Sequence, residues 1–294
     1  MNERILIIGG SGMLGHKLLQ RLSRDFETFA TIRGRLSELS AIPLFNSENT
    51  VEGVAVDRED LVRKAIARIR PDVVINAAGI IKQLPSSKNV VETLSVNSIF
   101  PHKLVEMASD VGFHLICIST DCVFDGRRGN YSESDTADAL DLYGQSKHFG
   151  EVTDANCLTL RTSIIGRELF TAHSLLEWFL SNRGGKVRGY VNAIYSGFPT
   201  IVFADIISGL VKHHPDLSGL YHVSSEPISK FDLLRLINER FGAGIETTAE
   251  TDLMIDRSLD SAKFRSETGF QPETWERMID EMASDPTPYD QWKQ

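Results

Sequence analysis

Residues 5–15 of the chain read ILIIGGSGMLG, and this stretch decides the fold. Ile5 to Ile8 form a short apolar run that is typical of a buried strand. Three glycines follow at three-residue spacing: Gly9, Gly12 and Gly15. The apolar residues around and beyond them recur at helical spacing: Leu14, Leu18, Leu19 and Leu22. The sequence therefore predicts a strand, a tight glycine turn and a helix, which together are the first unit of a parallel α/β sheet.

The three glycines suit a turn that binds a dinucleotide. Such a turn needs a residue that tolerates positive φ, a backbone that a pyrophosphate can approach without a Cβ in the way, and a helix packed closely on the strand. The helix N-terminus adds free amides and a partial positive charge. A tight structural turn would use the same residue type, but the position directly after the first strand favours cofactor binding.

The first half of the chain repeats this alternation of strand and helix. Further strands are expected over 27–32, 72–75, 114–119 and 158–162, and helices after Asp57 and over 90–111. The order predicts an α/β fold with a Rossmann-type doubly wound parallel sheet. Beyond about residue 165 the alternation breaks down. We expect an NADP-binding Rossmann domain over 1–165 and a smaller α/β substrate-binding lobe over 166–294, with parts that interleave.

Two local expectations concern the second half. Trp178 and Phe179 are expected to pack the smaller lobe, and the closing tail with Pro286 and Pro288 is expected to be a surface excursion.

Composition and charge exclude several classes of protein. The formal charge of −9 at pH 7 argues against a nucleic-acid partner, because such proteins need a basic stripe. No stretch approaches the roughly 20 apolar residues of a membrane span, and the first residues lack the features of a signal peptide. The three cysteines have no metal-ligand spacing. We therefore expect a cytoplasmic protein with reduced thiols, no metal, and neither membrane nor nucleic acid as a partner.

The residues after the second expected strand indicate which dinucleotide is bound. An NAD site usually carries an acidic residue there for the adenosine 2′-hydroxyl, whereas this chain has the run TIRGR over 31–35. A guanidinium suits a 2′-phosphate through bidentate, charge-assisted hydrogen bonds. Arg33 therefore favours NADPH, with NADH as the alternative. Two solvated arginines in a loop would give the same sequence.

Three residues in the middle of the chain suggest proton transfer to a carbonyl. Thr120 follows a predicted strand, at the edge where open α/β sheets bind ligands. Tyr143 and Lys147 would lie one turn apart on a helix. A nearby ammonium favours the phenolate, so we expect Lys147 to lower the pKa of Tyr143. Thr120 could then hold the carbonyl while Tyr143 delivers a proton. A chance pairing of tyrosine and lysine is common at this spacing, but the order of all the motifs argues against it.

At this point the chain resembles the extended short-chain dehydrogenase/reductases, and within them the dTDP-4-dehydrorhamnose reductase-like sugar-nucleotide reductases. The resemblance covers nearly the whole length. It is carried by the runs GGSGMLG over 9–15, NAAG over 76–79, STDCVFDG over 119–126 and YGQSK over 143–147. The run over 119–126 is the specific one, whereas the others are typical of the superfamily.

The resemblance implies the roles of the site residues. Thr120, Tyr143 and Lys147 would be catalytic, and Lys147 would also bind the nicotinamide ribose. The remaining cofactor-binding residues would be Gly9, Gly12, Met13, Leu14, Gly15, Arg33, Asp57, Ala77, Ala78 and Gly79. The substrate would be bound by Asp121, Cys122 and Arg257, although a surface salt bridge would explain Arg257 nearly as well. Asn97 matches the asparagine of the family's helix, with a structural role.

The resemblance also implies the reaction, which is the NADPH-dependent reduction of the 4-keto group of a nucleotide-activated deoxysugar. Two departures leave the sugar open: Cys122 stands where the reductases commonly have tyrosine, and the loop over 80–84 differs from theirs. The dehydratases carry an Asp-Glu pair after the threonine, and the missing glutamate counts against that activity. A nucleotide-sugar 4-epimerase, or a non-catalytic regulatory subunit similar to that of methionine adenosyltransferase, remains an alternative. Members of the reductase family often dimerise, so the resemblance also allows a homodimer.

Overall fold

The computed structural model describes residues 3–292, apart from the side chains of residues 85 and 86. Seven parallel strands form one sheet in the order β11-β6-β5-β4-β1-β2-β3. They are β1 (Arg4–Ile8), β2 (Glu27–Thr31), β3 (Thr50–Val51), β4 (Val73–Asn76), β5 (His114–Thr120), β6 (Cys157–Thr162) and β11 (Gly219–His222). The order reverses at β1, as in doubly wound sheets. The Rossmann-type α/β fold predicted from the sequence is confirmed.

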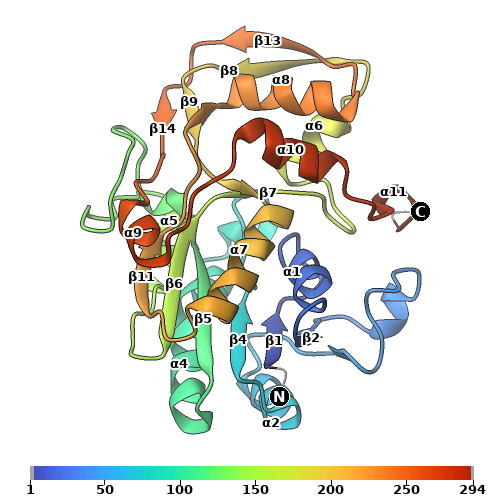
Figure 1. The fold of residues 1–294 in the computed structure, drawn as a ribbon, viewed down its shortest axis with the longest axis vertical. Coiled ribbons are helices and arrows are strands. Elements are labelled where there is room, and N and C mark those ends of the chain that lie inside the picture. The colour runs from blue at the N-terminus through green and yellow to red at the C-terminus, as the bar shows by residue number, and fades with distance from the viewer. Residues whose placement is uncertain (1–2, 293–294) are drawn as a thin grey trace.

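Helices cover both faces of the sheet (Figure 1). One face packs against α1 (Gly15–Leu22) and α7 (Thr200–His213), and the other against α2 (Glu59–Ile69) and α4 (Phe100–Val111). The alternation of side chains along β1 shows why both layers are needed: Ile5 and Ile7 belong to the first apolar cluster, and Leu6 and Ile8 to the second. A strand that is apolar at every position is stable only when both of its faces are buried.

The helix expected over 90–111 is built in three parts. These are α3 (Val90–Leu94), a π-helical turn η3 (Ser95–Ile99) and α4. Pro101, in the first turn of α4, has no amide to donate to the carbonyl of Asn97, so the regular α-helical ladder is interrupted there. The π-helical turn turns Asn97 inward, where its side chain is buried.

Most residues from 164 onward form a cap above the carboxyl ends of the strands (Figure 1). Its strands are β7 (Ile164–Ile165), β8 (Lys186–Tyr190), β9 (Ala193–Tyr195), β10 (Phe198–Pro199), β12 (Ile228–Ser229), β13 (Glu246–Glu250) and β14 (Ile255–Asp256). Its helices are α6 (Leu175–Leu180), α8 (Lys230–Phe241), α9 (Ala262–Thr268), α10 (Trp275–Ala283) and α11 (Tyr289–Trp292). Two elements from this half, α7 and β11, lie with the main sheet. The role of 166–294 in substrate binding stays a prediction.

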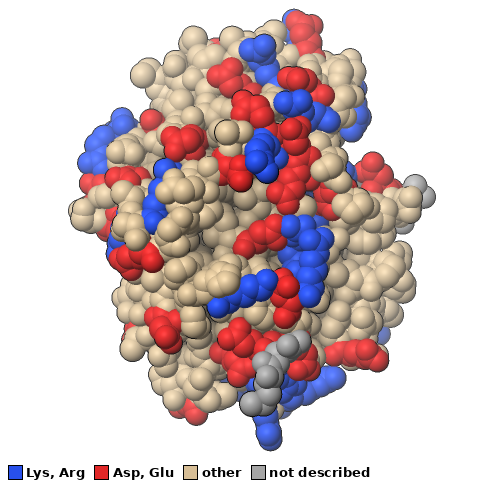
Figure 2. Space-filling model, in the orientation of Figure 1, with Lys and Arg blue, Asp and Glu red and all other residues tan. Residues whose placement is uncertain are grey.

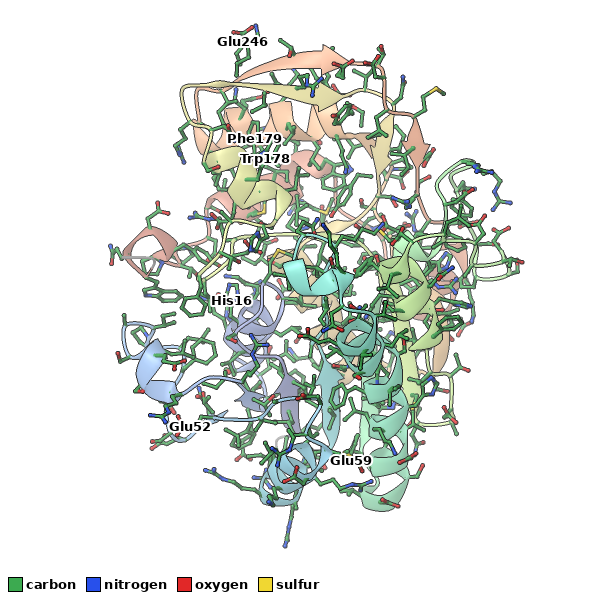
Figure 3. All side chains as sticks on the ribbon, turned by 180° about the vertical axis from the view of Figure 1, so that it is seen from behind. His16, Glu52, Glu59, Trp178, Phe179 and Glu246 are labelled. Atoms are coloured by element: carbon green, nitrogen blue, oxygen red, sulfur yellow. The ribbon has the colours of Figure 1, made fainter. Side chains whose placement is uncertain are left out.

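The C-terminal tail lies at the surface with Pro286 and Pro288 exposed, as expected, but it is also anchored to α1, which was not expected. Tyr289 is buried, and its hydroxyl lies 2.8 Å from Nε2 of His16 on α1. Figure 3 shows His16 on α1, in the part of the molecule next to the C-terminal segment. The two prolines predict a loop at the surface, but the buried aromatic ring of Tyr289 anchors this segment.

The two aromatic residues of α6 have different environments (Figure 3). Phe179 is fully buried in the apolar core, as expected. Trp178 is 41% exposed, so the expectation that it packs the lobe is wrong. Neighbouring positions on a helix point in directions about 100° apart, so only one of the two can face the core. Figure 2 shows acidic and basic side chains interspersed over one face of the molecule.

Candidate active site

The glycine turn joins β1 to α1 and is fixed by contacts to both neighbouring strands. Gly9 has φ of +87°, and a Cβ there would lie 3.0 Å from Cα of Ala78. A Cβ at Gly15 would overlap the carbonyl oxygen of Gly9. The amide of Gly10 donates to the carbonyl of Thr31 at 2.8 Å, which ties the turn to the end of β2. Glycine at positions 9 and 15 is therefore required by the protein's own packing.

Gly12 is less constrained than the other two glycines, although a Cβ there would make one tight contact. Its φ is not positive, it is exposed, and an added Cβ would meet only the carbonyl oxygen of Gly9, at 3.3 Å. The missing side chain leaves the backbone open to a group from outside. A phosphate approaching the start of α1 would make use of such a surface. The residues present thus fit a dinucleotide, and the contact of Gly12 with its phosphates stays a prediction.

The other predicted cofactor residues lie around this turn, at the carboxyl edge of the sheet. Arg33 follows β2 and is exposed, and Asp57 is exposed in the segment between β3 and α2. The run from Ala77 to Gly79 follows β4, next to Gly9. Leu14 is buried in the core, so only its backbone could contact a cofactor. Met13 is half-buried.

We expect Arg33→Ala to weaken NADPH binding about 10- to 100-fold and to leave NADH binding unchanged. A hydrogen bond to a charged group contributes roughly 1.5–3 kcal/mol, and only NADPH carries the 2′-phosphate. Titration of both cofactors would measure the two dissociation constants. Arg68→Ala, an exposed arginine at the far end of α2, is the matched control. Equal losses for the two cofactors would contradict the assignment.

The predicted catalytic residues meet at the carboxyl end of β5. Thr120 is the last residue of β5 and is buried. Tyr143 and Lys147 lie one turn apart on α5 (Leu142–Phe149), which Asp141 caps through a 3.0 Å bond from the amide of Gly144. The Nζ of Lys147 donates to the carbonyl of Ile118 at 2.7 Å, so α5 is fastened to β5 at the level of the threonine.

Packing explains why Tyr143 is held next to β5. The short turn η4 (Asp121–Val123) follows Thr120, whose hydroxyl accepts from the amide of Cys122 at 3.1 Å. A Cβ on Gly144 would overlap the carbonyl oxygen of Cys122. Glycine at this position therefore lets α5 lie directly on the turn. Glycine therefore follows Tyr143 in the motif for a reason of packing, which is separate from the chemistry expected of Tyr143.

The pKa of Tyr143 is not lowered, which corrects the expectation from sequence. Burial raises it well above its ordinary value, and the nearby Cys122 adds to the rise, while Thr120 partly offsets it. Burial also lowers the pKa of Lys147, and Cys117 and Glu151 partly offset that change. Desolvation disfavours the charged form of both groups. Tyr143 is thus a protonated phenol at neutral pH, which is the form that donates a proton.

The three predicted substrate residues lie together beyond the end of β5. Asp121 is buried, and its Oδ1 accepts from the Thr120 hydroxyl at 3.1 Å. Burial raises the pKa of Asp121, and the charge of Arg257 partly offsets this. Arg257 is held by the carbonyls of Phe124, at 2.7 Å, and Asp125, at 3.4 Å. It is therefore part of this loop and not a member of a surface salt bridge.

Burial raises the pKa of the Cys122 thiol to about 12, so this residue is a neutral group at the site. Its side chain is half-buried beside Tyr143. A cysteine offers a small and weakly polar surface at this position.

Sequence reasoning missed Lys82, which lies in the loop over 80–84 that differs from the reductases. Its ammonium lies 5.6 Å from the ring centroid of Tyr143 and 2.8 Å from Oδ2 of Asp141. The departure of the loop over 80–84 from the reductase pattern was the only feature of the sequence that pointed to Lys82. Lys82 thus places a positive charge near the ring of Tyr143.

Buried polar contacts hold α5 and the neighbouring loop in place beside the site. Asn97 bonds to the amide and carbonyl of Ile80, at 2.9 and 3.0 Å, and to the hydroxyl of Ser146 at 3.1 Å. It therefore ties the loop over 80–84 to α5, which is the structural role expected for it. Arg161 on β6 forms a buried ion pair with Glu151 at 2.7 Å, just after α5.

The described residues 3–292 contain no group of three or more His, Cys, Asp or Glu side chains that could hold a metal. Over the same residues, no helix has both the length and the apolar character needed to cross a membrane.

Comparison with known proteins places this site in a family. A family model described as the RmlD substrate binding domain matches residues 3–287. A dTDP-4-dehydrorhamnose reductase of Aggregatibacter actinomycetemcomitans is 28% identical over 303 residues, covering 94% of this chain and 97% of the relative. Methionine adenosyltransferase 2 subunit beta of Danio rerio is 33% identical over 153 residues, covering 51% of this chain and 42% of the relative.

A solved structure shares the fold along the whole chain. The dTDP-4-dehydrorhamnose reductase of Bacillus anthracis, in complex with NADP, has a TM-score of 0.77 and 20% identity, and the match covers 96% of this chain and 99% of that one. The resemblance inferred from the motifs is confirmed. The chain belongs to the RmlD substrate binding domain family.

Proposed function

We propose that this protein is an NADPH-dependent reductase that acts on the 4-keto group of a nucleotide-activated deoxysugar. The observation that carries the proposal is the meeting of Thr120, Tyr143 and Lys147 at the carboxyl end of β5, in the same edge of the sheet as the glycine turn. The reductase that matches along 94% of the chain supports it.

The residues of the chain supply the proton and the orientation. The hydroxyl of Thr120 would turn its proton from Oδ1 of Asp121 to the substrate carbonyl. Tyr143, protonated at neutral pH, would donate its proton to the carbonyl oxygen as the C–O bond becomes single. Lys147, fixed on the carbonyl of Ile118, would stabilise the phenolate that remains. When bound, NADPH supplies the hydride that reduces the carbonyl carbon. The ketone is thereby reduced to an alcohol, and the phenol regains its proton from water.

The choice of NADPH over NADH is supported by Arg33. This guanidinium stands exposed after β2, on the strand next to the glycine turn, where a 2′-phosphate would be bound. The relative from Bacillus anthracis binds NADP on the same fold. Asp57 and the run from Ala77 to Gly79 would line the adenine and the middle of the cofactor.

A regulatory role is the second candidate, because half of the chain resembles the beta subunit of a methionine adenosyltransferase. The intact set of Thr120, Tyr143 and Lys147 favours catalysis, since a purely structural subunit would not need it. A nucleotide-sugar 4-epimerase would use the same residues but would regain its cofactor in each cycle.

Turnover of NADPH with a panel of 4-keto nucleotide sugars tests the proposal. We expect at least one of them to be reduced, with one NADPH oxidised for each alcohol formed. Conversion without net loss of NADPH would instead identify an epimerase. If every sugar were inert while NADPH still bound, the proposed reduction would be wrong and the regulatory role would gain support. A cytoplasmic location and a homodimer stay predictions.

A further inference from the structure

Tyr195 lies at the active-site edge of the sheet although it belongs to the C-terminal half. It is the last residue of β9, and the chain then returns to the sheet, where the amide of Phe198 donates to the carbonyl of Ser163 at 2.9 Å. A Cβ on Gly197 would overlap that same carbonyl and would lie 2.5 Å from the hydroxyl oxygen of Tyr195. The phenol oxygen therefore lies beside the end of β6.

The end of β6 is next to the catalytic end of β5. Thr120 and Thr162 are paired in the parallel register of these two strands. The residues that follow them, Asp121 and Ser163, thus leave the sheet side by side. Tyr195 enters this place from the C-terminal half of the chain, and the nearby charge of the Asp121 carboxylate raises its pKa.

The hydroxyl of Tyr195 is the unusual feature. The side chain is 6% exposed, and its oxygen makes no hydrogen bond to any residue in the described part of the chain. Burial raises its pKa well above the ordinary value, Asp121 raises it further, and Ser163 lowers it in part. A buried polar group without a partner is costly, and phenylalanine would fill the same space without that cost.

A second tyrosine shows how a buried phenol in this protein is normally satisfied. Tyr221 is 4% exposed, and its hydroxyl donates to Oε2 of Glu267 at 2.6 Å. Tyr195 is buried to a similar degree and has no such partner among the described residues. Its partner is therefore to be sought outside the protein, at the edge where the substrate binds.

We propose that the hydroxyl of Tyr195 and the carboxylate of Asp121 together bind a ring hydroxyl of the sugar, on the carbon next to the reacting carbonyl, and that Tyr195 determines substrate specificity. The phenol donates a hydrogen bond to this hydroxyl, and the hydroxyl donates one to the carboxylate. Oγ1 of Thr120 and Oδ1 of Asp121 lie 3.1 Å apart, so the groups that they bind would lie on adjacent ring atoms. This inference rests on the proposed function.

The test compares Tyr195→Phe with the native enzyme on two substrates. One is a 4-keto nucleotide sugar with its 3-hydroxyl, and the other is the 3-deoxy analogue. For the variant, we expect kcat/KM to fall about tenfold with the first substrate and to stay unchanged with the second, because one hydrogen bond is lost only where the hydroxyl is present. NADPH affinity should not change.

Tyr221→Phe is the matched control, since it removes a buried phenol oxygen far from the reacting groups. Tyr221→Phe should leave the ratio of the kcat/KM values for the two substrates unchanged. Tyr195→Phe should unfold at the same or a higher denaturant concentration than the native protein, whereas Tyr221→Phe should unfold at a lower one. Equal changes of kcat/KM on both sugars in Tyr195→Phe, or no change on either, would show that Tyr195 only fills the core.

Binding measurements separate this inference from the proposed reaction. If the native enzyme loaded with NADPH reduces neither sugar, calorimetric binding of the same two sugars replaces turnover. A tenfold weaker binding of the 3-hydroxy sugar to Tyr195→Phe, with the 3-deoxy sugar unaffected, would then support the Tyr195 contact although the reduction had failed. Absence of any binding to the native enzyme would overturn both.

Discussion

Tyr143→Phe should lower kcat for reduction by roughly 10²- to 10⁴-fold, the usual contribution of a positioned general acid. The phenol is the proton donor in this account, and phenylalanine keeps its ring while removing only the hydroxyl. The backbone of Tyr143 would stay in place, because Asp141 caps α5 and Gly144 packs on the turn after β5. Single-turnover kinetics with saturating NADPH would measure the loss, and NADPH affinity should change less than twofold.

The pH dependence of the native enzyme gives a second readout of the same residue. Burial raises the pKa of Tyr143, so its proton is present throughout the neutral range. The rate of reduction should be flat there and should fall only in alkaline solution, as the proton is lost. Tyr221→Phe serves as the control and should keep native kcat. Full turnover by Tyr143→Phe would show that another group donates the proton.

Asp285→Ala should lower the free energy of unfolding by about 3–5 kcal/mol, because it leaves a buried lysine without its counter-charge. The Nζ of Lys17, on α1, lies 2.5 Å from Oδ2 of Asp285, and the two side chains are 1% and 9% exposed. Burial lowers the pKa of Lys17, and Asp285 partly offsets this. Equilibrium unfolding in denaturant would measure the change.

An exposed ion pair provides the matched control for this prediction. Lys186 and Glu246 are 2.6 Å apart but 60% and 65% exposed, so Glu246→Ala should cost less than about 1 kcal/mol. The double change Lys17→Met with Asp285→Leu should recover most of the stability, because apolar side chains replace both charges. A loss for Asp285→Ala no larger than for Glu246→Ala would mean that the C-terminal tail is not fastened to α1 by this pair.

Most of the sheet could be predicted from the sequence, because its strands and helices carry strong periodic patterns. The run from Ile5 to Ile8 is apolar at every position, and only a strand buried on both faces explains it. The contribution of β11 to the sheet could not be seen in this way. Gly219 to His222 is short and mixed in polarity, and its place is decided by pairing with β6, more than 50 residues earlier.

The meeting of Thr120, Tyr143 and Lys147 at one edge of the sheet was predictable because these residues stand in local motifs, whereas their electrostatics were not predictable. The spacing of Tyr143 and Lys147 suggests a phenol activated by an ammonium, but burial depends on which segments cover the site. The positions of Lys82 and Tyr195 near the site likewise depend on tertiary contacts. Nothing in the sequence around Tyr195 distinguishes a core residue from one whose hydroxyl lacks a partner.

The most direct test of the central claim follows a deuterium atom from the cofactor to the sugar. The enzyme is given NADPH deuterated at the transferable position of nicotinamide C4, together with a 4-keto nucleotide sugar that it consumes. The account predicts one deuterium at C4 of the product alcohol for each NADPH oxidised, and loss of this transfer in Tyr143→Phe. Product without deuterium at C4, or conversion of the sugar with no net oxidation of NADPH, would contradict it.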